Sequence, residues 1–173
     1  MKRLFALIMV LCMAVGFAAC GEPEAPSTQG TTPNMGNHSD PSAYYFTHNG
    51  TDIRLNGDMA AILSALGEPK KYTEETSCAF TGLDKTYTYD SFVIQTYPEG
   101  DKDYVYMFWF LDDMVKTPEG IKIGDTQAAV EAAYGTEAYN GKNAFITKQD
   151  NYSMTVILKD GVVNSIQYTI VIG

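Results

Sequence analysis

Two stretches of the chain share one pattern, and this repeat constrains the fold more than any other feature of the sequence. Residues 53–67 align with residues 121–135 at a constant offset of 68 positions, without a gap. Each stretch begins with apolar or β-branched residues, passes through a polar break, and continues into an alanine-containing apolar segment that ends at glycine. A repeat of this length indicates two equivalent supersecondary units.

The repeated stretches predict two short helices. Asp58 and Thr126 occupy the same position of the repeat, and both residue types cap helix N-termini by accepting a backbone N–H bond. The apolar residues after Asp58 follow the spacing of one buried helical face. Gly67 and Gly135 suit the left-handed residue that often ends a helix. Because isolated helices below roughly 12–15 residues are marginal in water, each helix must pack on other elements.

The segments behind each helix predict antiparallel strands, because they are rich in β-branched and aromatic residues. The expected extended segments are 78–80, 86–89, 92–97 and 104–111 in the first half, and 143–145, 152–158 and 162–172 in the second. We therefore expect an α+β fold of two tandem repeats, each a short helix followed by an antiparallel β-meander, with the helices packed on one face of the sheet. The repeat units are expected at about 43–116 and 117–173, within a single domain that spans 43–173.

The N-terminus predicts a targeting signal, residues 1–19. Lys2 and Arg3 precede an apolar segment that is shorter than the roughly 20 residues needed to span a bilayer. The segment ends in Phe17-Ala18-Ala19-Cys20, which resembles the lipobox of bacterial lipoproteins, with phenylalanine in place of the usual leucine. This resemblance implies cleavage before Cys20 and its lipidation. An ordinary secretory peptide cut nearby, or an uncleaved anchor, is the alternative.

The lipoprotein interpretation predicts a location. Lipidation of Cys20 adds two acyl chains of the palmitate type, which is the number generally needed for stable anchoring. We therefore expect the protein on the extracytoplasmic face of the cell membrane. Residues 20–42 contain the lipidated cysteine and are otherwise rich in Gly, Pro, Ser, Thr and Asn. This composition predicts a disordered tether between the anchor and the domain.

Charge and cysteine content exclude several classes of protein. Removal of the signal leaves ten basic residues against 21 acidic ones, a net charge near −11, which argues against nucleic acid as a partner. Cys12 leaves with the signal and Cys20 is lipidated, so Cys78 has no partner for an internal disulfide. A single thiol in an expected strand is most often a small buried hydrophobe.

The sequence lacks the usual catalytic combinations. The two histidines, His38 and His48, lie in the tether and at the domain edge, so Cys78 has no base beside it in sequence. Ligands for a structural zinc ion are missing. We therefore expect no catalytic residue, metal site or cofactor, and no enzyme activity. Several acidic clusters could nevertheless supply the carboxylate pair of a glycosidase, so a cell-wall hydrolase using acidic residues is the alternative function. These clusters are Glu74 with Glu75, Glu99 with Asp101 and Asp103, and Asp112 with Asp113.

Aromatic residues concentrate in the expected strands, and residues 104–111 are apolar on both faces. Tyrosine and tryptophan are enriched at protein interfaces, so we expect part of this aromatic surface to be exposed and used in binding. The candidate binding residues are Tyr87, Tyr89, Tyr97, Tyr104 and Tyr106. Within residues 104–111 we expect the tyrosines to be exposed and Met107 and Leu111 to be buried, because a phenol tolerates water.

Several segments also resemble known families. Residues 77–80, 84–89, 96–104 and 117–120 together are similar to a group of uncharacterised Gram-positive lipoproteins. The repeated helices resemble the repeat of β-lactamase-inhibitor-protein-like domains and of the small lipoproteins of outer-membrane protein assembly. In those families a short helical segment packs on one face of an antiparallel sheet, and the function is protein binding. The resemblance implies a membrane-anchored, non-catalytic module for a protein or cell-envelope partner.

Overall fold

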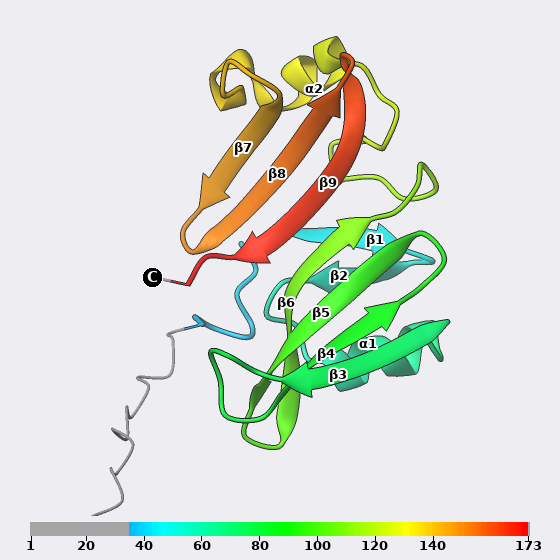
Figure 1. Cartoon of the computed structure of the whole chain (residues 1–173), viewed down its shortest axis with the longest axis vertical. Helices are drawn as coiled ribbons and strands as arrows, with labels where there is room; N and C mark the ends of the chain where they lie inside the picture. The colour runs from blue at the N-terminus through cyan, green and yellow to red at the C-terminus, as the bar shows by residue number, and fades with distance from the viewer. Residues whose placement is uncertain (1–34, 173) are drawn as a thin grey trace, which may run out of the picture.

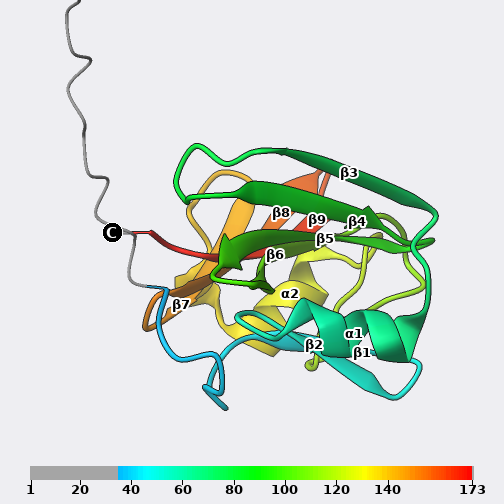
Figure 2. The same cartoon turned by 90° about the horizontal axis from the view of Figure 1, so that it is seen from below.

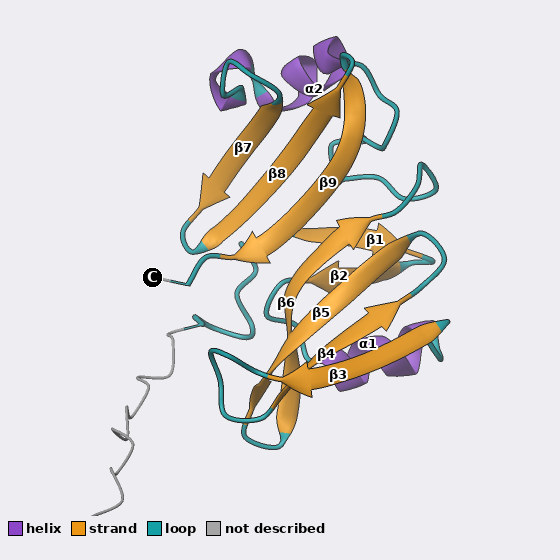
Figure 3. Cartoon of the chain, viewed as in Figure 1, coloured by secondary structure: helices purple, strands orange, loops and turns teal. Residues whose placement is uncertain are grey.

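A computed structural model describes residues 35–172 and shows an α+β fold built on one large sheet (Figures 1 and 3). Its strands are β3 (Lys71–Thr76), β4 (Leu83–Thr88), β5 (Phe92–Glu99), β6 (Lys102–Phe110), β7 (Ala144–Gln149), β8 (Tyr152–Lys159) and β9 (Val162–Ile170). The strand order is β3-β4-β5-β6-β9-β8-β7, and each neighbouring pair is antiparallel. The expected α+β class and antiparallel sheet are therefore confirmed.

A separate hairpin precedes the sheet and was not expected from the sequence. It consists of β1 (Tyr45–His48) and β2 (Thr51–Arg54). The turn residues Asn49 and Gly50 both have positive φ, at 50° and 79°, as the type I′ turns that match the twist of paired strands require. Phe46 and Ile53 from the two strands are fully buried. The hairpin is thus part of the hydrophobic core.

The two predicted helices are present. They are α1 (Met59–Leu66) and α2 (Gln127–Tyr134), and a 3-10 turn, η1 (Thr136–Ala138), follows α2. The Asp58 side chain accepts the N–H two residues further on at 3.0 Å, and the Thr126 side chain accepts the N–H three residues further on at 3.3 Å. Gly67 and Gly135 end the helices at φ 77° and 81°. Both helices and both expected caps are confirmed.

The core lies on one face of the sheet, which we call the inner face. Figure 2 shows α1, α2 and the β1–β2 hairpin together on this side. Residues directly opposite one another form a buried row across five strands: Tyr87, Ile94, Phe108, Tyr168 and Met154. The ring of Phe46 covers this row, with its centroid 4.9 Å from that of Phe108. Burial of a large apolar side chain contributes about 1.5–3 kcal/mol, so this row is a main source of stability.

Two β-bulges change the alternation of side chains along β6 and β9. In β6 the register with β5 shifts between Val105 and Met107, so Tyr106 is the extra residue. In β9 the register with β8 shifts in the same way, and Asn164 is the extra residue. A bulge reverses the faces of the residues that follow it. Val105 is therefore buried on the inner face with Phe108, while Met107 faces the opposite side.

The segment before β1 packs against the domain, so the expected boundary at residue 43 is too late. Met35 is 4% exposed, and its carbonyl oxygen accepts hydrogen bonds from Asn56 Nδ2 at 2.6 Å and Asn151 Nδ2 at 3.2 Å. The His38 ring stacks on that of Tyr104, with centroids 3.6 Å apart. Residues 35–42 therefore belong to the fold. The expected signal, Cys20 and the rest of the predicted tether lie outside the described residues.

The connection between β3 and β4 differs most from the expectation. Residues 78–80 form bends instead of a strand, because the Ser77 hydroxyl accepts the N–H groups of Ala79 and Phe80 and turns the chain. Cys78 is exposed, so the expectation of a buried thiol is wrong. The strand in this region is instead β3, whose polar sequence gives no alternating pattern because all six residues are exposed.

Candidate functional site

No described helix or hairpin covers the face of the sheet opposite the helices (Figure 2). Two rows of directly opposed residues cross it. The first row is Thr88, Val93, Trp109, Gln167, Thr155 and Ile146. The second row is Thr86, Gln95, Met107, Thr169, Ser153 and Lys148. We call these two rows the open face.

Trp109 and Met107 are the apolar centre of the open face. Both lie on β6, in the middle of the sheet, and both are partly exposed. Gln167 on β9 is directly opposite Trp109 and places its Nε2 3.8 Å from Met107 Sδ. The surrounding threonine, serine and glutamine side chains supply hydrogen-bond donors and acceptors. The open face can therefore hold another surface by apolar contact at its centre and by hydrogen bonds around it.

The five predicted binding tyrosines do not form one exposed surface. Tyr87 and Tyr97 are buried, at 6% and 1% exposure, and burial raises the pKa of both phenols. Tyr87 belongs to the inner row that packs under the helices. The Tyr97 hydroxyl donates to Asn56 Oδ1 at 2.7 Å. The side chains of Tyr87 and Tyr97 therefore belong to the core and expose little surface.

The other three predicted tyrosines are partly buried at separate places. The Tyr89 hydroxyl donates to the Gly67 carbonyl at 3.2 Å and so ties the end of α1 to the sheet. Tyr104 is covered by the ring of His38. Tyr106 is the bulge residue of β6 and packs partly against the core.

The expected exposure pattern along residues 104–111 is wrong. Val105 and Phe108 are both fully buried, although an uninterrupted strand would place them on opposite faces. The bulge at Tyr106 causes this reversal. Leu111, expected to be buried, follows the end of β6 and is 45% exposed. Simple alternation therefore missed the open face, because a single extra residue shifts every side chain beyond it.

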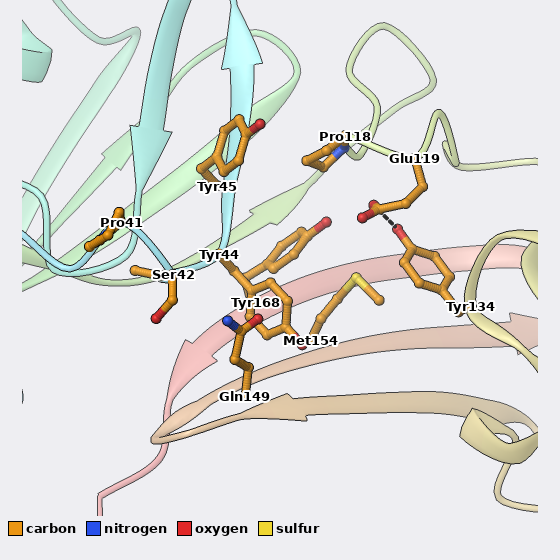
Figure 4. Close-up of a pocket in the computed structure, with 11 residues that line it drawn as sticks. Pro41, Ser42, Tyr44, Tyr45, Pro118, Glu119, Tyr134, Gln149, Met154 and Tyr168 are labelled. Carbon is orange, nitrogen blue, oxygen red and sulfur yellow. Dashed lines mark hydrogen bonds between the residues drawn. The ribbon is translucent and has the colours of Figure 1, made fainter.

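A pocket of about 250 Å³ lies on the inner side of the sheet, where the N-terminal segment, β1, the 117–120 connection, α2 and the second half of the sheet meet (Figure 4). Tyrosines supply much of its wall. Its lining residues include Tyr44, Tyr45, Glu119, Tyr134, Met154 and Tyr168. Figure 4 shows Tyr134 and Glu119 on one side of this space and Tyr44 with Tyr168 on another.

The polar groups of this pocket are partly organised by hydrogen bonds. The Tyr134 hydroxyl lies 2.7 Å from both Thr117 Oγ1 and Glu119 Oε2. Because a phenol has one proton, it donates to the carboxylate and accepts from the threonine hydroxyl. Tyr168 is 1% exposed, and its hydroxyl has no hydrogen-bond partner among the described residues. Burial raises the pKa of Tyr134 and Tyr168, so both phenols stay protonated at neutral pH. A small ligand in this pocket would contact aromatic side chains, one carboxylate and one phenol hydroxyl.

The acidic clusters are divided among different partners. Asp103 pairs with Lys85 at 2.6 Å, and Asp113 with Lys122 at 3.3 Å. Glu99 lies 3.2 Å from His38, and Glu74 accepts the Tyr72 hydroxyl at 2.7 Å. Within residues 35–172, no group of three or more His, Cys, Asp or Glu side chains could hold a metal ion. The hydrolase alternative gains no support from these pairings and stays a prediction.

No family model matches the chain, and no curated protein matches it. A solved structure that is similar to part of this chain is that of an extracellular protein containing a SCP domain from Bacillus anthracis str. Ames. The alignment has a TM-score of 0.40 and 14% identity, and it covers 65% of this chain and 43% of that protein. No helix within the described part of the chain is long and apolar enough to cross a membrane.

Proposed function

We propose that this protein is a membrane-anchored extracytoplasmic lipoprotein whose domain is a non-catalytic binding module for a protein or cell-envelope partner. The lipobox-like ending at Cys20 supports the anchor, because diacylation of that cysteine supplies two acyl chains. The open face is the binding surface. The domain consists of two tandem repeats, and their comparison identifies the residues that bind.

Matching backbone contacts before the helices support the tandem repeat. Residues 56–57 form backbone hydrogen bonds with Val105 of β6, at 2.8 and 3.0 Å. Residues 124–125 form backbone hydrogen bonds with Val163 of β9, at 2.8 and 2.8 Å. The first residue of each pair has positive φ, at 64° and 91°. The two pairs are 68 positions apart, as the sequence repeat requires.

The bulges support the same relation for the strands. Val105 and Val163 are 58 positions apart, and the bulge residues Tyr106 and Asn164 have the same separation. β6 therefore corresponds to β9. The sequence offset between equivalent residues is 68 at the helices and 58 at these strands. It falls because four strands follow the helix of the first unit, β3 to β6, whereas three follow the helix of the second, β7 to β9.

Equivalent positions on the inner face are apolar in both units. Val105 and Val163 are 0% and 1% exposed. Phe108 and Ile166, also 58 positions apart, are both 0% exposed. The core explains these residues, because large apolar side chains must fill the space under the helices in both units.

Equivalent positions on the outer face differ, and this observation carries the proposed function. Trp109 corresponds to Gln167, and Met107 corresponds to Ser165. The second unit forms its strand with polar residues at these positions, so the sheet itself does not require apolar ones. Tryptophan and methionine are enriched at protein interfaces. We therefore assign Trp109 and Met107 to partner binding.

The composition of the open face fits a protein partner. Among the twelve residues of the open face the charged one is Lys148, at one end of the second row, and the next charged residue on this side is Lys71 of β3, opposite Thr88 at the end of the first row. The centres of protein interfaces are depleted in charged residues, and their hot spots favour tryptophan. Charged side chains lie elsewhere on the acidic domain, and their net charge opposes non-specific association.

The binding function is tested by capture from native envelopes, with chemical cross-linking of full-length variants. Trp109→Ala should lose most of the cross-linked partner. Met114→Ala is the matched control, because Met114 is 78% exposed and lies outside the open face. Equal loss in both variants, or full capture by Trp109→Ala, would exclude the open face as the binding surface.

The anchor is tested separately by membrane fractionation. Cys20→Ala should move the protein from the membrane pellet to the soluble extracytoplasmic fraction. Cys78→Ala is the control and should stay in the pellet. If Cys20→Ala remains membrane-bound after a high-salt wash, lipidation of Cys20 is not the anchor.

A further inference from the structure

The two edges of the large sheet are protected differently. At the β7 edge, Tyr139 forms a bridge with Phe145, and the Asn140 N–H donates to the Ala144 carbonyl at 2.8 Å. At the other edge, β3 is the first strand of the sheet order and all six of its residues are exposed. An exposed edge strand presents unpaired backbone groups to another strand. β3 is therefore an available pairing surface.

The hydrogen-bond pattern shows which β3 groups point outward. The Ser77 N–H donates to the Gly82 carbonyl at 3.0 Å, in register with the β3–β4 pairing. In an antiparallel ladder, hydrogen-bonded pairs alternate along the strand. Lys71, Thr73 and Glu75 therefore bond toward β4, and the backbone groups of Tyr72, Glu74 and Thr76 point away from the sheet. An added strand must use these outward groups.

The charges on β3 are separated by sign. Lys71 is at its start and Glu75 near its end, and both lie on the same side of the sheet as the open face. None of the ion pairs among the described residues includes either side chain. Glu75 is also directly opposite Asp84, whose Oδ1 is buried without a hydrogen-bond partner. Like charges directly opposite are destabilising. Neither Glu75 nor Asp84 takes part in an ion pair among the described residues.

We propose that two copies of this protein associate through β3, antiparallel, about a two-fold axis at Thr73. This register brings Tyr72 opposite the Glu74 of the second copy, and both residues have outward backbone groups. It also brings each Lys71 opposite the Glu75 of the other copy, in a pair without backbone bonds, where side chains approach most closely. Charged residues usually protect an edge from pairing. Here their order makes the strand complementary to itself and supplies the cation that Glu75 and Asp84 lack.

Other registers fit this edge less well. Outward backbone groups must meet outward groups, so the axis can move only by one residue at a time along β3. An axis at Glu74 brings two glutamates directly together. An axis at Tyr72 leaves Lys71 opposite Thr73 and gives Glu75 no cation. The axis at Thr73 satisfies both Lys71–Glu75 pairs.

This association has a geometric consequence for a tethered protein. An antiparallel continuation of the sheet has its two-fold axis perpendicular to the sheet. Both copies then keep their helices on one side and their open faces on the other. The result is one continuous sheet that presents two open faces in the same direction, with both domains able to be tethered to one membrane.

Disulfide cross-linking of the full-length protein in native membranes tests the register. All variants carry Cys78→Ala to remove the exposed thiol. Thr73→Cys places two thiols at the axis, where Cα atoms about 4.5 Å apart are within disulfide range. Thr86→Cys is the matched control, because Thr86 lies directly opposite Thr73 but one strand further from the edge. Thr73→Cys should form a disulfide-linked dimer under mild oxidation, at least tenfold faster than Thr86→Cys. Equal rates would overturn the proposal.

Charge exchange tests the interaction itself, by co-purification of two differently tagged copies. Lys71→Glu alone and Glu75→Lys alone each place like charges opposite one another and should reduce co-purification severalfold. When a Lys71→Glu copy is expressed with a Glu75→Lys copy, both pairs become complementary and co-purification should return. The double variant Lys71→Glu, Glu75→Lys should also associate with itself. Loss of recovery in both combinations would contradict pairing through β3, and it would leave partner binding by the open face unaffected.

Discussion

The two units that we propose for the domain agree where they face the helices and differ where they face solvent. Val105 and Phe108 in β6 and their counterparts in β9 are all buried and apolar. On the opposite face, Trp109 and Met107 in the first unit correspond to glutamine and serine in the second. Core packing acts on both units equally, so it accounts for the agreement. The difference supports our proposal that the first unit binds a partner at its outer surface.

The units also differ in what lies at their outer edges. The outer edge strand of the second unit is β7, and the residues after η1 partly cover it. The first unit has one more strand, β3, and this strand leaves its edge open. Both differences place exposed, interaction-competent surface on the first unit. The comparison therefore makes two predictions. Substitutions of core-facing residues should lower stability to a similar extent in both units. Substitutions of outward-facing residues should impair partner binding more in the first unit than in the second.

The largest expected effect is on the inner face. Phe108→Ala and Ile166→Ala should each lower the free energy of unfolding by about 3–5 and 2–5 kcal/mol, respectively, because both side chains are 0% exposed. Urea denaturation of the purified variants measures both values. If Ile166→Ala costs less than about 1 kcal/mol, the two strands are not equivalent in the core.

A smaller effect is expected at the turn before each helix. Asn56→Ala removes the acceptor of the Tyr97 hydroxyl and one of the two donors to the Met35 carbonyl, and an unsatisfied buried group costs about 1–3 kcal/mol. Gly124→Ala occupies the equivalent position at φ 91°, where an added side chain meets no atom within 4 Å. Its cost should come from the left-handed backbone alone, about 1–2 kcal/mol. Thermal unfolding of both variants should show the greater loss for Asn56→Ala, and the reverse order would contradict the assigned role of Asn56.

The helix caps should have equal effects at neutral pH and unequal effects in acid. Asp58→Ala and Thr126→Ala should each cost about 1 kcal/mol at pH 7. The hydrogen bond from Lys102 lowers the pKa of Asp58 below its ordinary value of 3.8. The stabilisation by Asp58 is therefore complete above about pH 4 and is lost as the pH falls through the lower folded-state pKa.

Unfolding free energies measured between pH 7 and pH 2.5 test this difference. The effect of Asp58→Ala should shrink in acid, because the wild-type carboxylate is protonated there, while the effect of Thr126→Ala should persist because threonine does not titrate in this range. A pH-independent effect of Asp58→Ala would show that its ionised form contributes nothing.

Local features of the fold were predictable from the sequence, and the long-range features were not. The helices after Asp58 and Thr126 were predicted with their caps, because capping and apolar spacing act within a few residues. The last two strands were predicted as extended segments, and the turn between them, Asp160-Gly161 with φ 53° and 79°, is a typical hairpin turn. The β1–β2 hairpin was missed although Asn49-Gly50 carries the same signal.

The candidate site was less predictable, since it depends on register. The bulge at Tyr106 cannot be read from alternation, and it moves Met107 from the expected core side to the open face. β3 gives no apolar pattern because it is exposed along its whole length. Likewise, burial of Met35 depends on hydrogen bonds from Asn56 and Asn151, which are distant in sequence.

The smallest expected effect on stability tests the central claim most directly. Trp109→Gln gives the first unit the residue that the second unit has at the equivalent position. Its unfolding free energy and its partner capture from native envelopes are measured on the same preparation, beside Met114→Ala as the control, because Met114 is exposed and lies outside the open face. We predict a stability change near the ±0.5 kcal/mol typical of surface positions, with loss of most of the captured partner. A stability loss comparable with that of Phe108→Ala, or capture equal to wild type, would contradict the assignment of Trp109 to a binding surface.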